Sequence, residues 1–157
     1  MPDPARLRSD SPPMSLPDRD GGGETDPSRP EYDSDYRSVY WIRYYVLMVT
    51  RRRRPFFEDE KARARCEELM GEVAEKEGCR VVSCEVRPSR VIVEVLAPPT
   101  ISPHSLVTRL RHDAAGPLKA EFPEIKTAGG AFAHRYMVTT VPMPEGDREG
   151  FESLVPR

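Results

Sequence analysis

Hydrophobic and polar residues alternate in the middle of the chain, between residues 90 and 97. One set of alternate positions is apolar and consists of Val91, Val93 and Val95. The other set consists of Arg90, Ile92 and Glu94. Side chains two residues apart leave the same side of a strand, so this period predicts a strand from Arg90 to Ala97 with one buried face.

Three more segments are rich in β-branched and aromatic residues, which favours strands at 39–50, 80–86 and 132–141. The tripeptide Arg87-Pro88-Ser89 is typical of a tight turn, so we expect the strand at 80–86 to lie beside the one that starts at residue 90.

Between these strands, two segments carry apolar residues at helical spacing. The first runs from Glu58 to Gly78; its acidic start and final glycine suit the two ends of a helix. The second begins with Ser102 as N-cap and Pro103 at the first helical position, and runs to about Ala120. The order strand, helix, strand, strand, helix, strand predicts an α+β fold: a ferredoxin-like βαββαβ sandwich, an antiparallel sheet with two helices on one face and an open opposite face.

The first 38 residues differ from the rest in composition. They hold seven of the 17 prolines and a run of three glycines, so residues 1–38 are predicted to be disordered. They also carry nine acidic and five basic residues, which leaves 17 acidic and 19 basic residues for the remaining chain. The acidic tail is either an inert leader or a segment that screens the basic surface of the domain from nonspecific DNA. That domain is expected at 39–142, and a degenerate C-terminal tail follows it at 143–157.

Targeting signals and cysteines add little. No apolar run is long enough to span a bilayer and no secretory signal is apparent, so we expect a cytoplasmic protein. Cys66, Cys79 and Cys84 lack the spacing of a metal site, so we expect them to be core thiols. Residues 154–157, Leu-Val-Pro-Arg, read either as native sequence or as a protease site left by an expression vector, in which case a longer natural C-terminus could carry a nucleophile.

Four segments together carry the pattern of one protein family: EVRPSRVIVEV (85–95), RYYVLMVTRRRRPFFEDE (43–60), HSLVTRLRHDAAGPLKAEFPEIK (104–126) and FAHRYMVTTV (132–141). They resemble, in order, its core strand, its first strand with a basic exit, its second helix and its last strand. The chain thus resembles the single-tyrosine HUH transposases, the IS200-like enzymes and their REP-associated relatives, from about Tyr44 to Val141.

The resemblance implies a site that this chain has lost. In the family, two histidines two residues apart hold a divalent metal such as Mg²⁺, and a tyrosine on a short C-terminal helix attacks DNA. The histidine positions are Arg90 and Ile92 here; arginine stays protonated, and isoleucine has no donor atom. The tail contains no tyrosine, and Phe151, near the expected position, has no oxygen to attack phosphorus. We therefore predict no metal, no cofactor and no nicking chemistry.

Other residues near this lost site have simpler expected roles. Tyr136, with His134 on the same strand face, is a weak candidate nucleophile, because the family carries a structural tyrosine there. Glu94 is expected to pair with Arg90 on the same face of the same strand. The prolines and glycines at Pro142, Pro144, Gly146 and Gly150 argue against a helix in the tail.

Basic residues are the remaining candidates for a binding surface. They are Arg51, Arg52, Arg53 and Arg54 at the exit of the first strand, with Arg109, Arg111 and Lys119 on the second helix. Such a run is either a solvated turn or a set of phosphate contacts, and the match to a basic stretch in a DNA-binding family favours the second.

The sequence thus predicts a homodimeric, catalytically inactive protein that binds single-stranded or hairpin DNA, with Ile92 buried in the dimer. Two alternatives stay open. One is a protein-interaction or dimerisation module that keeps only the scaffold. The other is an active transposase, which cleaves and rejoins single strands, with an atypical site.

Overall fold

A computed structural model describes residues 32–157 of the chain, in two units that divide after Trp41. The described part of the first unit is a hairpin of β1 (Asp33–Ser34) and β2 (Val39–Tyr40). The Asp35 carboxylate closes its turn by accepting hydrogen bonds from the backbone N–H groups of Arg37 and Ser38, which lower its pKa. The tail predicted at 1–38 therefore lies mostly outside the described residues, and its boundary falls inside this hairpin.

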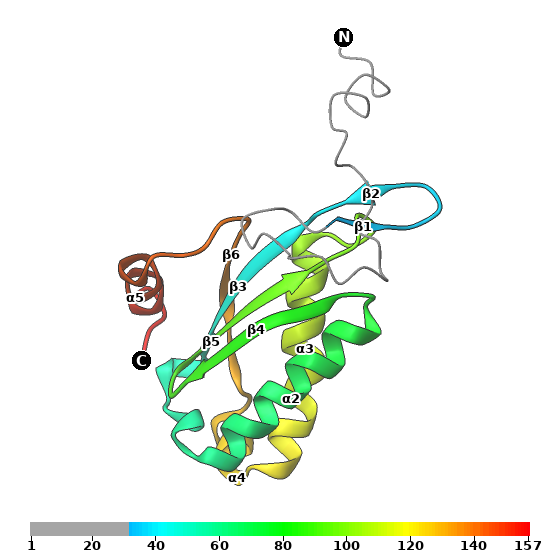
Figure 1. Cartoon of the computed structure of the whole chain (residues 1–157). Coiled ribbons are helices and arrows are strands. Elements are labelled where there is room, and N and C mark those ends of the chain that lie inside the picture. The colour runs from blue at the N-terminus through cyan, green and yellow to red at the C-terminus, as the bar shows by residue number, and fades with distance from the viewer. Residues whose placement is uncertain (1–31) are drawn as a thin grey trace. The chain divides into compact units, whose positions relative to one another are not determined.

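The second unit is built on a four-stranded antiparallel sheet (Figure 1). Its strands are β3 (Arg43–Thr50), β4 (Arg80–Arg87), β5 (Arg90–Leu96) and β6 (Phe132–Thr139). Their spatial order is β4-β5-β3-β6, which is the order of a ferredoxin-like sandwich. The predicted α+β fold is confirmed, although the strand predicted at 39–50 is divided into β2 and β3.

Helices α2 (Glu60–Lys76) and α3 (Pro103–Glu121) both cover one face of this sheet (Figure 1). The side chain of Asp59 caps α2 by accepting a hydrogen bond from the N–H of Lys61. Ser102 caps α3 as predicted and accepts from the N–H of Ser105 at 3.1 Å. A short α4 (Pro123–Ala128) follows α3, because Pro123 ends one helix and begins the next.

The main apolar core lies between these helices and the sheet. Val91, Val93 and Val95 point into it, as the alternation predicted. The largest side chains that it buries completely include Phe57, Met70, Leu106 and Leu110. Hydrophobic burial on this scale is what holds the sandwich together.

Helix α5 (Glu145–Ser153) covers part of the opposite face (Figure 1). The prediction that prolines and glycines prevent a helix here is wrong. Pro144 occupies the N-cap position, where its missing N–H costs no helical hydrogen bond. Acidic residues Glu145 and Asp147 suit the first turn, and the half-buried Phe151 packs on an apolar cluster of the sheet. Tertiary contact thus outweighs the low helix propensity of the glycines.

Among residues 32–157, no helix is both long and apolar enough to cross a membrane.

Candidate functional site

Strand β5 and helix α5 bring together the three positions that family resemblance assigns to metal and nucleophile. Arg90 and Ile92 leave the sheet on the side opposite α2 and α3, and α5 lies over that side (Figure 1). Phe151 of α5 packs against the cluster that contains Ile92. The predicted degenerate positions therefore do lie in one place.

Arg90 is the charged centre of this place. Only 7% of the residue is exposed, and its guanidinium pairs with two carboxylates of α5. One nitrogen donates to Glu145, and the other lies 3.4 Å from a carboxylate oxygen of Glu152. Burial acts to lower the pKa of Arg90, but the hydrogen bond and charge of Glu145 outweigh it, so the pKa is raised and the group is a permanent cation.

The sequence-based pairing of Arg90 with Glu94 is wrong. Glu94 instead pairs with Arg43 at 3.3 Å and accepts a hydrogen bond from Ser83 at 3.3 Å. Both partners of Glu94 lie on the strands that flank β5, whereas Arg90 is four positions away on the same strand, about 13 Å along its axis. Arg90 is drawn to α5, which sequence reasoning had not expected to exist.

The ionic contacts extend to both sides of Arg90. Arg148 of α5 lies 3.7 Å from Glu85 on β4 and 3.5 Å from Glu145. The hydroxyl of Ser89 donates to Glu152. We call Ser89, Arg90, Glu145, Arg148 and Glu152, together with Glu85, the α5 latch. The hydrogen bond from Arg90 is the main reason why the pKa of Glu145 is lowered.

The acidic members of the latch were missed by sequence reasoning. A signal was available, because Glu145 and Glu152 are seven residues apart and so lie on one face of any helix formed there. That face could have been matched to the arginine that replaces a histidine.

Apolar contacts complete the site beside the latch. Ile92 is 6% exposed and packs with Leu47 of β3 and Met143, and Tyr45, Met137 and Phe151 surround them. The chain's own C-terminal segment thus covers Ile92. Ile92 therefore needs no second subunit to be buried.

The site does not fit the divalent metal of the family. Within residues 32–157, no group of three or more His, Cys, Asp or Glu side chains could hold a metal ion. The two carboxylates nearest the old histidine positions are both committed to the Arg90 guanidinium. Burial raises the pKa of Cys79 to about 11 and of Cys84 to about 12, so these thiols do not offer thiolate ligands either.

Tyr136, the weak candidate nucleophile, lies on the other side of the sheet. It packs against the core under α3, and its hydroxyl is 2.7 Å from Nδ1 of His104, not of His134. Arg111 lies over its ring at 5.9 Å and donates a hydrogen bond to the carbonyl of His134. These contacts hold α3 against the edge strand β6 and are structural.

The candidate phosphate-binding arginines form a tight loop after β3, which we call the basic loop (Arg51–Arg54). Arg52 and Arg53 both have a φ of 54°, a left-handed conformation that is uncommon outside glycine. Arg51 donates to the carbonyl of Gly129 at 3.1 Å, so it fastens the loop to the turn before β6. Arg52 and Arg54 are exposed and Arg53 is half-buried.

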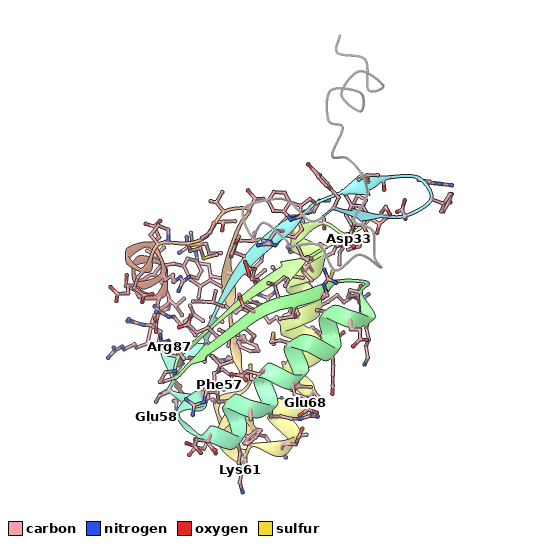
Figure 2. All side chains as sticks on the ribbon, viewed as in Figure 1. Asp33, Phe57, Glu58, Lys61, Glu68 and Arg87 are labelled. Carbon is pink, nitrogen blue, oxygen red and sulfur yellow. The ribbon has the colours of Figure 1, made fainter. Side chains whose placement is uncertain are left out.

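Buried hydrogen bonds hold the basic loop in place. Thr50 is 0% exposed, and its hydroxyl contacts the carbonyl of Arg54 at 2.7 Å and that of Ser89 at 3.2 Å. Its backbone N–H also donates to the carbonyl of Ser89. The loop therefore sits against the β4–β5 turn, and the labelled Arg87 and Phe57 mark that end of the sheet in Figure 2.

The basic residues of α3 are not gathered at this loop. Arg109 pairs with Glu77 at the end of α2, at 3.6 Å, and Arg111 is committed to β6. Lys119 is exposed near the C-terminal end of α3. The structure thus assigns two of these three predicted contacts to holding elements together.

Comparison with known proteins places this fold in a family. The family model described as "Transposase IS200 like" matches residues 38–145, so the matched segment ends where α5 begins. A crystal structure at 1.90 Å resolution of a "putative transposase" from Deinococcus radiodurans R1 is similar with a TM-score of 0.66 and 22% identity, over 78% of this chain and 95% of that one. A structure of a REP-associated tyrosine transposase bound to a REP hairpin matches with a TM-score of 0.46 and 12% identity, over 75% of this chain and 68% of that one.

No protein with a curated description matches the chain. The likeness to the Deinococcus structure shows a shared fold. Because the family match covers more than half of the 157 residues, with the strand order of the sheet in agreement, the chain belongs to the IS200-like transposase family.

Proposed function

We propose that this protein binds single-stranded or hairpin DNA and does not cut it. Membership of a transposase family supports a nucleic-acid role. The observation that carries the loss of cutting is the α5 latch: a buried arginine and two carboxylates stand where the family would need metal ligands. The absence of a cofactor stays a prediction.

DNA cleavage by the family's chemistry needs metal ligands and a nucleophile, and the residues at these positions can supply neither. A metal-assisted attack needs neutral or anionic ligands, and the guanidinium of Arg90 is neither. A nucleophile needs an oxygen or sulfur, and Phe151 supplies none. Tyr136 has an oxygen, but this residue packs on the face of the sheet that α2 and α3 cover, whereas Arg90 lies on the opposite face.

The basic loop is the part that we assign to phosphate contacts. Within residues 32–157 the guanidiniums of Arg52 and Arg54 make no hydrogen bond or ion pair, and both residues are exposed, so these groups are available to a phosphate. Holding two adjacent arginines in a left-handed conformation costs about 1–3 kcal/mol each, and such strain is commonly retained at functional positions. Arg51, committed to Gly129, positions the loop.

A cleavage assay tests the proposed absence of cutting. The full chain is incubated with a labelled single-stranded hairpin and Mg²⁺ or Mn²⁺, and denaturing gels separate covalent adducts and cut strands. We expect neither product. An adduct that persists in wild-type protein and disappears in Tyr136→Phe would establish an atypical active transposase instead.

Salt dependence of the affinity tests the proposed DNA binding. Each phosphate contact on a single strand contributes about −0.7 to the slope of log K against log salt, so Arg52→Ala with Arg54→Ala should flatten the slope by about 1.4. Lys76→Ala with Arg80→Ala is the matched control: it removes two exposed positive charges where α2 ends and β4 begins. If both double variants change the slope equally, the basic loop makes no specific contact with phosphate.

A dimerisation module is the second candidate. Strand β4 lies at an edge of the sheet, and Val82 on it is 45% exposed, which is a surface that can pair with another chain. A dimer mass in light scattering, lost in Val82→Lys, together with no DNA binding by the wild-type protein, would favour this function over ours.

A further inference from the structure

Helix α5 brings negative charge to a face where a DNA-binding fold would be expected to meet phosphate. It carries Glu145, Asp147, Glu149 and Glu152 against a single base, Arg148. Two of these carboxylates bind the guanidinium of Arg90 in the way that phosphate oxygens bind arginine. Arg90 is therefore a complete anion-binding position whose present anions belong to the chain itself.

The docking of α5 is weak compared with that of α2 and α3. None of its nine residues is buried, and Phe151 is only half-buried. Met143, just before the helix, and Val155, just after it, are the buried residues of the segment. An element with few buried apolar contacts opens at lower free energy than the core does.

The Arg90 position is adjacent to the basic loop. Ser89 joins them: its hydroxyl donates to Glu152, and its carbonyl accepts hydrogen bonds from Thr50 at the start of the loop. The bonds that fix the loop do not include α5, so the loop keeps its shape when the helix leaves. A strand of nucleic acid held by Arg52 and Arg54 would have its next phosphates near the latch.

We propose that Arg90 is a second phosphate-binding position, continuous with the basic loop, and that α5 is an internal competitor whose Glu145 and Glu152 occupy it until nucleic acid displaces them. This inference rests on the DNA binding proposed above. Binding and α5 docking exclude one another, so each must weaken the other by the same factor.

Removing the two latch carboxylates should raise DNA affinity. In Glu145→Gln with Glu152→Gln, a buried cation loses its counter-charges, which strongly disfavours the docked state. We expect the affinity of the full chain for single-stranded DNA to rise about fivefold or more, which is the lower end of typical coupling. The salt slope should steepen by about 0.7, because one more phosphate is contacted.

A charge-matched control separates the latch from simple repulsion. Asp147→Asn with Glu149→Gln removes two exposed negative charges from the same helix without touching Arg90. An equal rise in affinity in both double variants would overturn the competitor role and leave only long-range repulsion. Phe151→Ala offers a second route, since it loosens the docked helix with no change of charge and should also raise affinity.

Hydrogen exchange supplies a readout that does not depend on variants. In the wild-type protein, saturating single-stranded DNA should speed exchange in the amides of α5 while those of α3 stay protected. If the wild type binds DNA and α5 stays equally protected, the inference fails and the proposed function stands. If neither the wild type nor the latch variant binds DNA, both fail.

Discussion

The two faces of the four-stranded sheet are held by different forces. On one face, α2 and α3 bury a continuous apolar core in which Val93, Leu110 and Met70 are all fully buried. On the other face, α5 is held by the ion pairs of Arg90 and by a cluster of three buried residues, Leu47, Ile92 and Met143. The first face depends on hydrophobic burial and the second largely on charge.

This difference determines which face of the sheet can respond to pH and salt. Hydrophobic burial is non-directional and responds little to pH or salt, so the helix-covered face fixes the fold. Charge pairs depend on protonation and on competing ions, so the α5 face is the one that can respond to its surroundings. The same face carries Arg90 and Ile92.

The largest expected effect is a cavity in the main core. Leu110→Ala should lower the free energy of unfolding by about 3 kcal/mol, because it removes buried methyl groups from a site that collapses only partly. Urea denaturation measures it, and Leu110→Met, which nearly conserves volume, is the control. A loss no greater than that of the control would contradict the assignment of this face as the stabilising one.

Reversal of the buried charge should have a smaller effect, confined to α5. Arg90→Glu places a third carboxylate beside Glu145 and Glu152, so the helix should detach and its amides should lose protection from exchange. The global free energy of unfolding should fall by about 2 kcal/mol at most. Arg80→Glu, at an exposed position on β4, should change little. Protection of α5 equal to that of wild type would show that the ion pairs are not what docks it.

Acid should weaken the same contact without any mutation. The pKa of Glu145 is lowered from its ordinary 4.5 in the folded protein, so its contribution is complete above that pH and is lost as the pH falls through the lowered value. NMR shifts of α5 amides should therefore report undocking below about pH 4.5, before the core unfolds. Glu145→Gln should remove part of that transition, and an unchanged transition would assign it to other carboxylates.

The smallest expected effect is that of Arg90→Glu on the reactivity of the cysteines, which should not change. Burial raises the pKa of Cys66, Cys79 and Cys84, so at pH 8 these free thiols should react slowly with iodoacetamide in the native protein and rapidly in urea. Because Cys66 and Cys84 belong to the helix-covered side, Arg90→Glu should leave their labelling rate unchanged. Faster labelling in that variant would mean that the two faces are coupled.

Much of the fold could be predicted from local pattern. The alternation of Val91, Val93 and Val95 gave the correct buried face, and Ser102 with Pro103 gave the correct start of α3. The two helices and the four sheet strands occur in the predicted order. The buried face of a strand and the start of a helix depend on residues close in sequence, so the spacing of apolar and capping residues predicts them.

The site could be predicted only in part. Arg90, Ile92 and Phe151 were placed together by resemblance, and the structure does bring them together. The partners of Arg90 were not found, because Glu145 and Glu152 lie more than 50 residues away in sequence, in a segment with poor helix propensity. The sequence also suggested the same phosphate-binding role for all four arginines of the basic loop. Arg51 instead donates a hydrogen bond to the carbonyl of Gly129, a tertiary contact that the sequence does not reveal.

By itself, the sequence determined that this chain forms an antiparallel sandwich and that its core strand carries arginine at position 90 and isoleucine at position 92, since strand period and side-chain chemistry are local properties. Only the tertiary structure decided which groups pair with Arg90. Whether a proline- and glycine-containing tail forms a helix depends on the surface that it meets, and here that surface is a buried arginine beside Ile92. Contacts between distant segments set that outcome, because the energy that folds α5 comes from its partner on the sheet rather than from its own residues.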